Sequence, residues 1–267
     1  MLGAVCGDIA GSVHEFHALK DGADWNSFPL LTKKNYFTDD SILTFAVAKA
    51  LMSPYKSDEE LKEHIVDNFH EFAKRYPHGG YGGRFARWLM NGEREPYNSF
   101  GNGSAMRVSP AGWIANSLQE TERMAKLTAE VTHNHPEGIK GARSVAGAIF
   151  LARNGASKEE IKNYIESKYG YDLSRSLAEI QPDYSFNETC QGSVPEALVA
   201  FLESENFEDA IRKAIWLRGD ADTQAAIAGS VAEAFYGMPE ELRADTEKYL
   251  TDDLYEIYEN WRKFIKK

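Results

Sequence analysis

Apolar side chains recur at intervals of three or four residues over most of the chain. In residues 60–76 they fall at Leu61, Ile65 and Phe69, and residues 157–169 repeat the pattern. This spacing places them on one face of an amphipathic helix. The same criterion predicts further helices at about 41–52, 121–131, 138–154, 194–203, 207–217, 222–236, 239–249 and 252–265.

Capping signals mark two of these helix starts. Ser57 with Glu60, and Ser157 with Glu160, match the capping box, in which the serine hydroxyl and the glutamate carboxylate satisfy each other's backbone N–H groups. We therefore expect both helices to begin directly after the serine.

Signals for strands are weak by comparison. No Asn-Gly or Asp-Gly dipeptide lies between alternating apolar and polar segments, which is the usual mark of a β-hairpin. The Asn-Gly at 91–92 follows a helical pattern and indicates a helix end. Residues 22–36, 78–85 and 98–110 have the composition of loops. The pattern predicts an all-α fold.

Composition indicates an ordinary globular chain. Its 267 residues suffice for one large or two small domains, and 43% are hydrophobic and 27% charged. No repeat or long linker divides the chain, so we expect a single domain over 1–267. No apolar run reaches the roughly 18 residues of a membrane helix. The first residues do not resemble a secretory signal, so we expect a cytoplasmic protein.

Charge and cysteine content exclude further classes. Thirty basic against forty-one acidic residues give a net charge of −11, without the basic stripe that non-specific nucleic-acid binding requires. Cys6 and Cys190 make neither a disulfide framework nor a metal-ligand pattern. We expect an acidic monomer that binds no membrane, with nucleic acid a partner only as a modified substrate.

Two clusters of oxygen-bearing side chains stand where predicted helices begin. Their members are Thr38, Asp39 and Asp40 in the first cluster, and Asp220, Asp222 and Thr223 in the second. Aspartate and threonine are favoured at helix starts because they accept hydrogen bonds from unpaired N–H groups and oppose the helix dipole. Capping is a sufficient interpretation of either cluster alone.

The two clusters together favour a metal site. A cap needs one oxygen, whereas each cluster offers two carboxylates and a hydroxyl, and neighbouring buried anions are costly without a cation. Hard oxygen donors of this kind suit Mg²⁺, Mn²⁺ or Ca²⁺. Adjacent aspartates diverge by about 100° on a helix, so they hold different ions or bridge two. We therefore predict a binuclear site.

Other metal and phosphate motifs do not fit. An EF-hand loop that began at Asp220 would require Glu at its twelfth position, where this chain has Val231. The sequence contains neither GxxxxGK[ST] nor HExxH. The two histidines of THNHPEG, at 132–138, lack a third zinc ligand and equally suit a polar loop before a helix.

A glycine-rich loop offers a place for phosphate. GNGSAMR, at 101–107, lets the backbone approach a ligand closely and point its N–H groups at phosphate oxygens. Metal ions and amides would thus hold an anionic ligand in an acidic protein. Tyr97 and Phe100 are candidates to stack on a base, although aromatic residues also serve packing.

Five motifs in this order resemble the ADP-ribosylglycohydrolase family over nearly the whole chain. They are GDIAGSVHEF (7–16), FTDDS (37–41), GNGSAMR (101–107), THNHPEGIKGA (132–142) and GDADTQAAIAG (219–229). The resemblance implies an orthogonal all-α helical bundle with two Mg²⁺ or Mn²⁺ ions in its cleft. It also implies hydrolysis at the anomeric carbon of the distal ribose, with an ADP-ribosylated protein or other ADP-ribosylated molecule as substrate and ADP-ribose as product.

The resemblance also implies roles for single residues. The metal ligands would be Thr38, Asp39, Asp40, Asp220, Asp222 and Thr223. The substrate-binding residues would be Glu15, Gly101, Asn102, Gly103, Ser104, Met106 and His133. We also expect Ser99 and Phe100, which directly precede the glycine-rich loop, to contact the substrate. For catalysis we expect Asp39 or Asp222 to orient the attacking water and Glu15 to transfer a proton, with a supporting role as the alternative for Glu15.

Two departures from the family pattern bear on the target. Arg218 stands where relatives commonly have a first glycine, and Ser99 stands where some arginine-specific relatives carry an acid. Serine-specific relatives lack this acid too. We expect ADP-ribosyl-arginine on protein as the substrate, and serine, nucleic acid or a small molecule as alternative carriers. A non-catalytic ADP-ribose-binding regulator and a metal-dependent phosphohydrolase remain competing hypotheses.

Overall fold

The computed structural model describes residues 1–17, 19–20 and 22–266, and within these ranges it contains helices and no named strand. Gly101 and Thr189 form an isolated antiparallel bridge. The all-α prediction is therefore confirmed. None of the helices in the described ranges combines the length and the hydropathy of a membrane span.

The helices in chain order are α1 (Leu2–Gly11), α2 (Asp39–Met52), α3 (Asp58–Arg75), α4 (Gly83–Met90), α5 (Gly103–Met106), α6 (Ser109–Ile114), α7 (Leu118–Glu130), α8 (Pro136–Arg153), α9 (Lys158–Tyr169), α10 (Leu177–Ile180), α11 (Cys190–Glu203), α12 (Phe207–Trp216), α13 (Ala221–Tyr236), α14 (Glu240–Glu247) and α15 (Asp252–Phe264), with a 3-10 turn at Gln181–Asp183.

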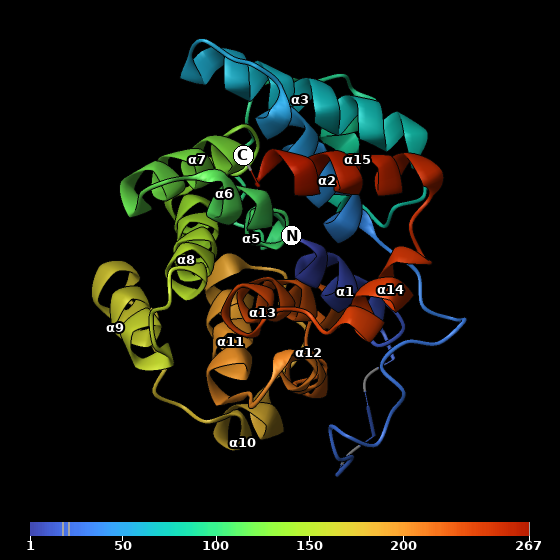
Figure 1. Cartoon of the computed structure of the whole chain (residues 1–267), viewed down its shortest axis with the longest axis vertical. Helices are drawn as coiled ribbons and strands as arrows, with labels where there is room; N and C mark the ends of the chain where they lie inside the picture. The colour runs from blue at the N-terminus through green and yellow to red at the C-terminus, as the bar shows by residue number, and fades with distance from the viewer. Residues whose placement is uncertain (18, 21, 267) are drawn as a thin grey trace.

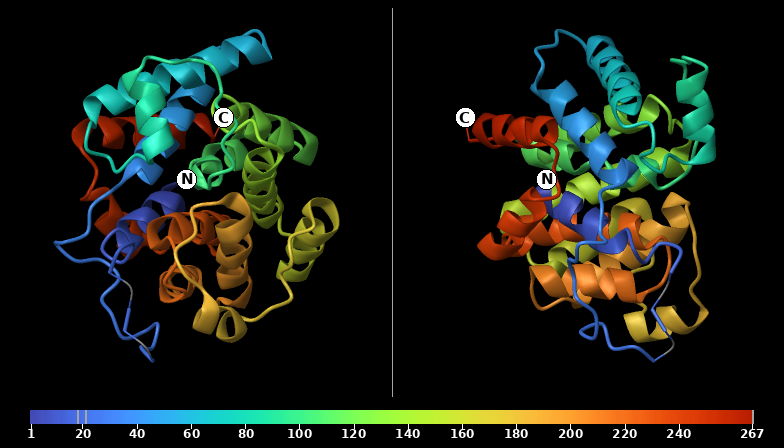
Figure 2. Two further views of the ribbon diagram at one scale, coloured as in Figure 1. Left: turned by 180° about the vertical axis from the view of Figure 1, so that it is seen from behind. Right: turned by 90° about the vertical axis from the view of Figure 1, so that its right-hand side faces the viewer.

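Helices α1 and α13 lie side by side near the middle of the molecule (Figure 1). Helices α11 and α12 pack against α13 on one side, whereas α2, α3 and α15 lie on the other side of α1. The segment between α1 and α2 contains no helix in its described residues and runs along the outside of the bundle (Figure 2). Helices α1 and α13, which are far apart in the sequence, thus lie together at the centre.

Three glycines at intervals of four residues allow α1 and α13 to approach closely. A Cβ atom at Gly7 would lie 2.0 Å from the carbonyl oxygen of Ala225, and one at Gly3 would lie 2.3 Å from that of Gly229. A Cβ atom at Gly11 would lie 2.4 Å from the Cα atom of Asp222. Any larger residue would therefore push α13, and with it the second carboxylate cluster, away from α1.

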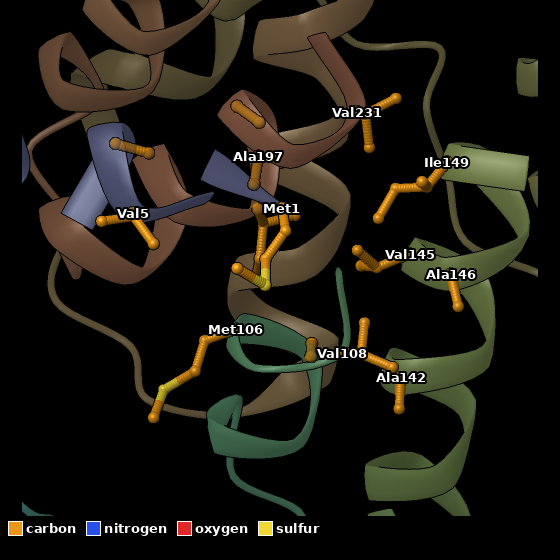
Figure 3. Close-up of a cluster of buried hydrophobic side chains, with 14 of the residues drawn as sticks. Met1, Val5, Met106, Val108, Ala142, Val145, Ala146, Ile149, Ala197 and Val231 are labelled. Atoms are coloured by element: carbon orange, nitrogen blue, oxygen red, sulfur yellow. The ribbon is translucent and has the colours of Figure 1, made fainter. Parts of the chain in front are cut away.

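Side chains from several helices fill the space beside this contact (Figure 3). They belong to one continuous buried cluster. Small residues on α8 and α11 let these helices pack closely. Those labelled in Figure 3 are Met1, Val5, Met106, Val108, Ala142, Val145, Ala146, Ile149, Ala197 and Val231.

The predicted helices are all present, with ends displaced by up to four residues. The largest displacement is at α11, which begins at Cys190 after the Thr189 cap and carries Pro195 inside it. The capping box at Ser157 is complete. The one at Ser57 is only half formed, because the carboxylate of Glu60 accepts from the N–H of Lys56 instead.

Five helices were not predicted, namely α1, α4, α5, α6 and α10. Helix α1 is buried on every side, so it lacks the polar face on which periodicity depends. The loop predictions for 78–85 and 98–110 are wrong in part, because α4 begins at Gly83, α5 at Gly103 and α6 at Ser109. These short helices are stabilised by tertiary packing rather than by their own composition.

Candidate active site and metal centre

The two carboxylate clusters come together at the N-terminal ends of α2 and α13. The hydroxyl of Thr223 donates to Asp40 Oδ2 at 3.3 Å, across 183 positions of sequence. One carboxylate oxygen each from Asp8, Asp40 and Asp222 lie within 4.8 Å of one another. Segments 37–41 and 219–223, which the sequence analysis expected to meet, therefore do meet.

Capping accounts for only part of the first cluster. Thr38 caps α2, where its hydroxyl accepts from the N–H of Asp40 at 3.3 Å. Asp220 occupies the same position in α13, yet its side chain makes no capping bond. Its Oδ2 accepts instead from Nδ2 of Asn102 at 2.7 Å. The Asp220 side chain thus turns away from its own helix and toward the glycine-rich loop, whereas Asp222 accepts from the backbone N–H of Thr223 at 2.9 Å.

Asp8 is a site residue that the sequence analysis missed. This fully buried carboxylate accepts hydrogen bonds from the N–H and hydroxyl groups of both Thr38 and Ser41. It therefore ties α1 to the start of α2 and also contributes an oxygen to the carboxylate group. A lone charge in the otherwise apolar run of residues 2–11 was the signal that could have revealed it.

A second group of carboxylates lies beside the first. Oxygens of Glu15, Asp220 and Asp222 also lie within 4.8 Å of one another, so Asp222 belongs to both groups. Asp39 belongs to neither group but lines the same cleft, beside Gly80. Each of these two overlapping groups could hold a metal ion, and Asp222 could contribute to both.

The buried carboxylates of the site lie so close together that a bound cation would stabilise their charged forms. Burial, reinforced by neighbouring carboxylates, raises the pKa of Asp39 to about 8 and that of Glu15 to about 7. The pKa values of Asp40 and Asp222 are raised well above the ordinary range for the same reasons. Oδ1 of Asp40 is buried without a hydrogen-bond partner. These all-oxygen groups fit hard divalent cations, which would neutralise them and satisfy this atom.

We expect the metal-free protein to lose stability as the pH rises from about 4 to about 8. The pKa of Asp39 is raised from 3.8 to about 8, so in this window the folded state binds more protons than the unfolded state. The free energy of unfolding therefore falls with pH. Thermal unfolding in chelator should show a decrease of several degrees in Tm, and saturating Mg²⁺ should abolish it. A metal-free Tm that rises over this window would contradict the assignment.

A cleft runs from the carboxylates along the glycine-rich loop. Its lining includes residues from α2, α4, α5 and the loops before α5, α11 and α13. Two backbone hydrogen bonds join this loop to residues 188–190. The N–H of Asn102 donates to the carbonyl of Glu188 at 2.8 Å, and the N–H of Cys190 donates to the carbonyl of Phe100 at 2.9 Å. The backbone of Gly101 to Gly103 therefore forms a fixed wall of the cleft.

His133 lies against this wall in a defined tautomer. Nη2 of Arg107 donates to the hydroxyl oxygen of Thr132 at 2.8 Å, and this oxygen lies 2.8 Å from Nδ1 of His133. Since Arg107 already donates to this oxygen, the contact favours the arrangement in which the Thr132 hydroxyl gives its own hydrogen to Nδ1. Nε2 then carries the proton and faces the loop, 3.2 Å from where a Cβ of Gly103 would be.

The surroundings of His133 also keep its ring neutral. Burial, followed by the charges of Arg107 and Arg84, lowers the pKa of His133 well below its ordinary value. Arg107 is itself fully buried, with its guanidinium 4.5 Å from the centre of the Phe69 ring. The imidazole is thus a neutral hydrogen-bond donor to whatever occupies the cleft.

We expect Thr132→Val to weaken binding of the anionic ligand predicted for the glycine-rich loop about fivefold to tenfold, as the loss of one oriented hydrogen bond does. Valine keeps the shape of Thr132 but removes the oxygen that fixes the His133 tautomer. Proton–nitrogen NMR of the imidazole should show Nε2–H alone in the wild type and both tautomers in the variant. An unchanged tautomer would contradict the relay from Arg107.

The remaining predicted substrate residues divide into two sets. The cleft lining contains Glu15, Ser99, Gly101, Asn102, Gly103, Met106 and His133. Phe100 and Ser104 lie outside it: the Phe100 ring packs 5.3 Å from that of His135, and the Ser104 hydroxyl donates to the carbonyl of Gly138 at 2.8 Å. Their side chains therefore support the loop from behind.

The departures noted in the sequence have structural consequences. Arg218 has a φ of +68°, in the left-handed region that glycine adopts without strain, so relatives with two glycines here relieve that strain. The Ser99 hydroxyl accepts from the N–H of Gly101 at 3.2 Å and helps to shape the loop.

Comparisons with known proteins agree with this geometry. The family profile described as ADP-ribosylglycohydrolase matches residues 1–265. ADP-ribosylhydrolase ARH3 of Homo sapiens is 28% identical, covering 95% of this chain and 90% of that protein. ADP-ribosylarginine hydrolase Tri1 of Pseudomonas putida is 29% identical, over 89% of this chain and 70% of that protein.

A third relative and a solved structure extend the comparison. ADP-ribosyl-[dinitrogen reductase] glycohydrolase of Rhodospirillum rubrum is 25% identical over 89% of this chain and 84% of that protein. A solved structure titled ADP-ribosylglycohydrolase-related protein complex superposes with a TM-score of 0.68 at 22% identity, covering 99% of this chain and 95% of that one. It shares the all-α fold. The match over nearly its whole length shows that this chain belongs to the ADP-ribosylglycohydrolase family, whose members hydrolyse glycosyl bonds.

Proposed function

We propose that this protein is a hydrolase dependent on divalent metal that releases ADP-ribose from modified arginine side chains of proteins. The observation that carries the proposal is the convergence of both carboxylate clusters on one cleft beside the glycine-rich loop. The named activity of the arginine hydrolase Tri1, which matches 89% of this chain over 70% of its own length, favours arginine as the carrier.

The acidic residues would hold two Mg²⁺ or Mn²⁺ ions. Their ligands would be Thr38, Asp39, Asp40, Asp220, Asp222 and Thr223, with Asp8 holding the start of α2 in place. When bound, such ions orient ribose hydroxyls and acidify water toward hydroxide. Asp39 or Asp222, both of which line the cleft, would accept hydrogen bonds from the attacking water and direct it at the anomeric carbon.

Acidic side chains of the protein would stabilise the transition state and transfer a proton. The transition state at the anomeric carbon is oxocarbenium-like, so the surrounding carboxylates would stabilise its positive charge. Burial and the charges of Asp220 and Asp8 raise the pKa of Glu15 to about 7, which suits a group that exchanges protons at neutral pH. Glu15 would give its proton to the departing nitrogen, because guanidine leaves as a strong base.

The glycine-rich loop would hold the rest of the substrate. The backbone N–H groups of Gly101 to Gly103 would bind diphosphate oxygens, and the Nε2–H of His133 would donate to an oxygen of the ligand. The guanidinium of Arg84 lies 5.0 Å from the centre of the Tyr97 ring, at the same end of the cleft as His133. This end would take the adenosine.

Assays with differently linked substrates would test the proposal. Peptides that carry ADP-ribose on arginine or on serine, ADP-ribosylated DNA ends and free ADP-ribose should be incubated with Mg²⁺, with Mn²⁺ and with chelator. We expect intact ADP-ribose to appear fastest from the arginine peptide, and only with metal. Release of AMP or phosphate would select a phosphohydrolase, and binding without release would select a regulator.

Serine-linked ADP-ribose is the second candidate, because Ser99 stands where some arginine-specific relatives carry an acid. A higher kcat/KM on the serine peptide than on the arginine peptide would select it. Either result would leave the metal-dependent cleavage at the anomeric carbon intact.

A further inference from the structure

Two phenylalanines form an exposed pair at the mouth of the cleft. Phe16 is 75% exposed and Phe186 is 46% exposed, and their rings stack with centroids 6.0 Å apart and planes inclined by 29°. Phe16 follows Glu15 in the segment between α1 and α2, whereas Phe186 belongs to the loop before α11. The pair thus links two loops that approach the site from opposite parts of the sequence.

This pair lies at the carboxylate end of the cleft. Phe186 lines the cleft together with Glu15, Glu188 and Asp220, and Glu15 and Asp220 belong to one group of carboxylates. Exposed aromatic rings of this size next to a site commonly mark a binding surface, because water contact with them is unfavourable. Here the rings stand beside acidic side chains, and Glu188 is one that belongs to neither of the two carboxylate groups described above.

Aromatic faces next to carboxylates favour one kind of ligand. A planar cation stacks on an aromatic ring and is attracted by its negative face, while the carboxylates accept its N–H groups. Arginine meets these requirements better than lysine because its guanidinium is flat and weakly hydrated. A neutral group, such as a serine side chain, would gain little from this surface.

We propose that Phe16, Phe186 and Glu188 form an acceptor subsite that holds the guanidinium of the modified arginine and sets the preference for arginine over serine. This inference rests on the proposed function and specifies which residues select its substrate. The guanidinium plane packs on an exposed face of this stacked ring pair, and Glu188 accepts its outer N–H groups. The subsite is separate from the adenosine end, where Tyr97 and Arg84 lie.

A binding experiment can test the subsite without turnover. Wild-type protein saturated with Mg²⁺ and ADP-ribose should be titrated with N-acetyl-arginine amide and, as a matched neutral probe, with N-acetyl-citrulline amide. We expect saturable binding of the arginine probe only, weakened at least fivefold in Phe186→Ala. Tyr255→Ala, which removes a ring that is 41% exposed on α15, is the matched control and should bind like the wild type.

The kinetic counterpart compares substrates. In Phe16→Ala and Phe186→Ala, we expect the ratio of kcat/KM on arginine-linked to serine-linked peptide to fall about tenfold, mainly through KM on the arginine peptide. The Tm shift caused by ADP-ribose alone should match that of the wild type, which shows that the variants fold. Equal losses on both peptides, or an unchanged ratio, would overturn the subsite.

The two proposals fail in distinguishable ways. If the wild type releases no ADP-ribose from arginine peptides, the proposed function is wrong whatever the probes show. If it does release ADP-ribose but binds the arginine and citrulline probes equally, the function stands and the acceptor subsite is wrong.

Discussion

Replacement of Asp40 by asparagine is expected to abolish hydrolysis and, at the same time, to raise the stability of the metal-free protein. Asparagine keeps the shape of the side chain but removes one of the charges that crowd the site. Without a cation these charges repel one another in a buried place, so the loss of one is stabilising. With a cation the same loss removes a ligand, and we expect kcat to fall by about 10³-fold or more.

Melting curves and activity together check this result. In chelator the Tm of Asp40→Asn should exceed that of the wild type, and added Mg²⁺ should raise it much less than it raises the wild-type Tm. Asp209→Asn is the matched control, because Asp209 is also a buried helix carboxylate but is paired with Lys213 at 2.8 Å. That variant should lose stability and still respond to Mg²⁺. Full activity in Asp40→Asn would contradict the metal site.

The second large effect is expected from Gly7→Ala. A Cβ atom there would lie 2.0 Å from a backbone oxygen of α13, and backbone cannot move aside as a flexible side chain can. Overpacking of cores typically costs about 1–3 kcal/mol, and we expect the upper end or more here. Because α1 carries Asp8 and α13 carries Asp222, the displacement should also separate the carboxylates and weaken Mg²⁺ binding.

Chemical denaturation and a Mg²⁺ titration measure both parts of this prediction. Gly83→Ala is the control, since a Cβ atom at this helical glycine would meet no atom within 4 Å. It should change the free energy of unfolding by less than about 1 kcal/mol, and in the stabilising direction, because alanine favours helix. A Gly7→Ala protein of wild-type stability would mean that α1 and α13 lie further apart than described.

Predictions from the sequence succeeded where a helix has one buried and one exposed face. In helices α3 and α9, for example, apolar residues recur every three or four positions with charged residues between them. The ends of both helices lie within two residues of the prediction. Helix α1 was not predicted because all its residues are buried, so the sequence shows no polar face by which a helix is recognised. The four-residue spacing of Gly3, Gly7 and Gly11 is present in the sequence, but it indicates close helix packing only once the partner helix is known.

The candidate site shows the same division. Side-chain chemistry alone singled out the clusters at 38–40 and 220–223, because hard oxygen donors in such number exceed what helix caps need. The contribution of Asp8 was missed, since a single aspartate in an apolar run does not reveal which helix start it will meet. The roles of Ser104 and Phe100 depended on which way each side chain turns, and periodicity contains no such information.

The sequence by itself determined the helical class, the kinds of ligand atom available and, through five ordered motifs, the family. Only the tertiary structure decided that Asp40 and Thr223 touch, that Asp222 is shared between two carboxylate groups, and that Phe16 stacks on Phe186. The reason is physical: local preference depends on neighbours three or four residues apart, whereas these contacts join segments over 150 residues apart and exist only when α1 and α13 pack together.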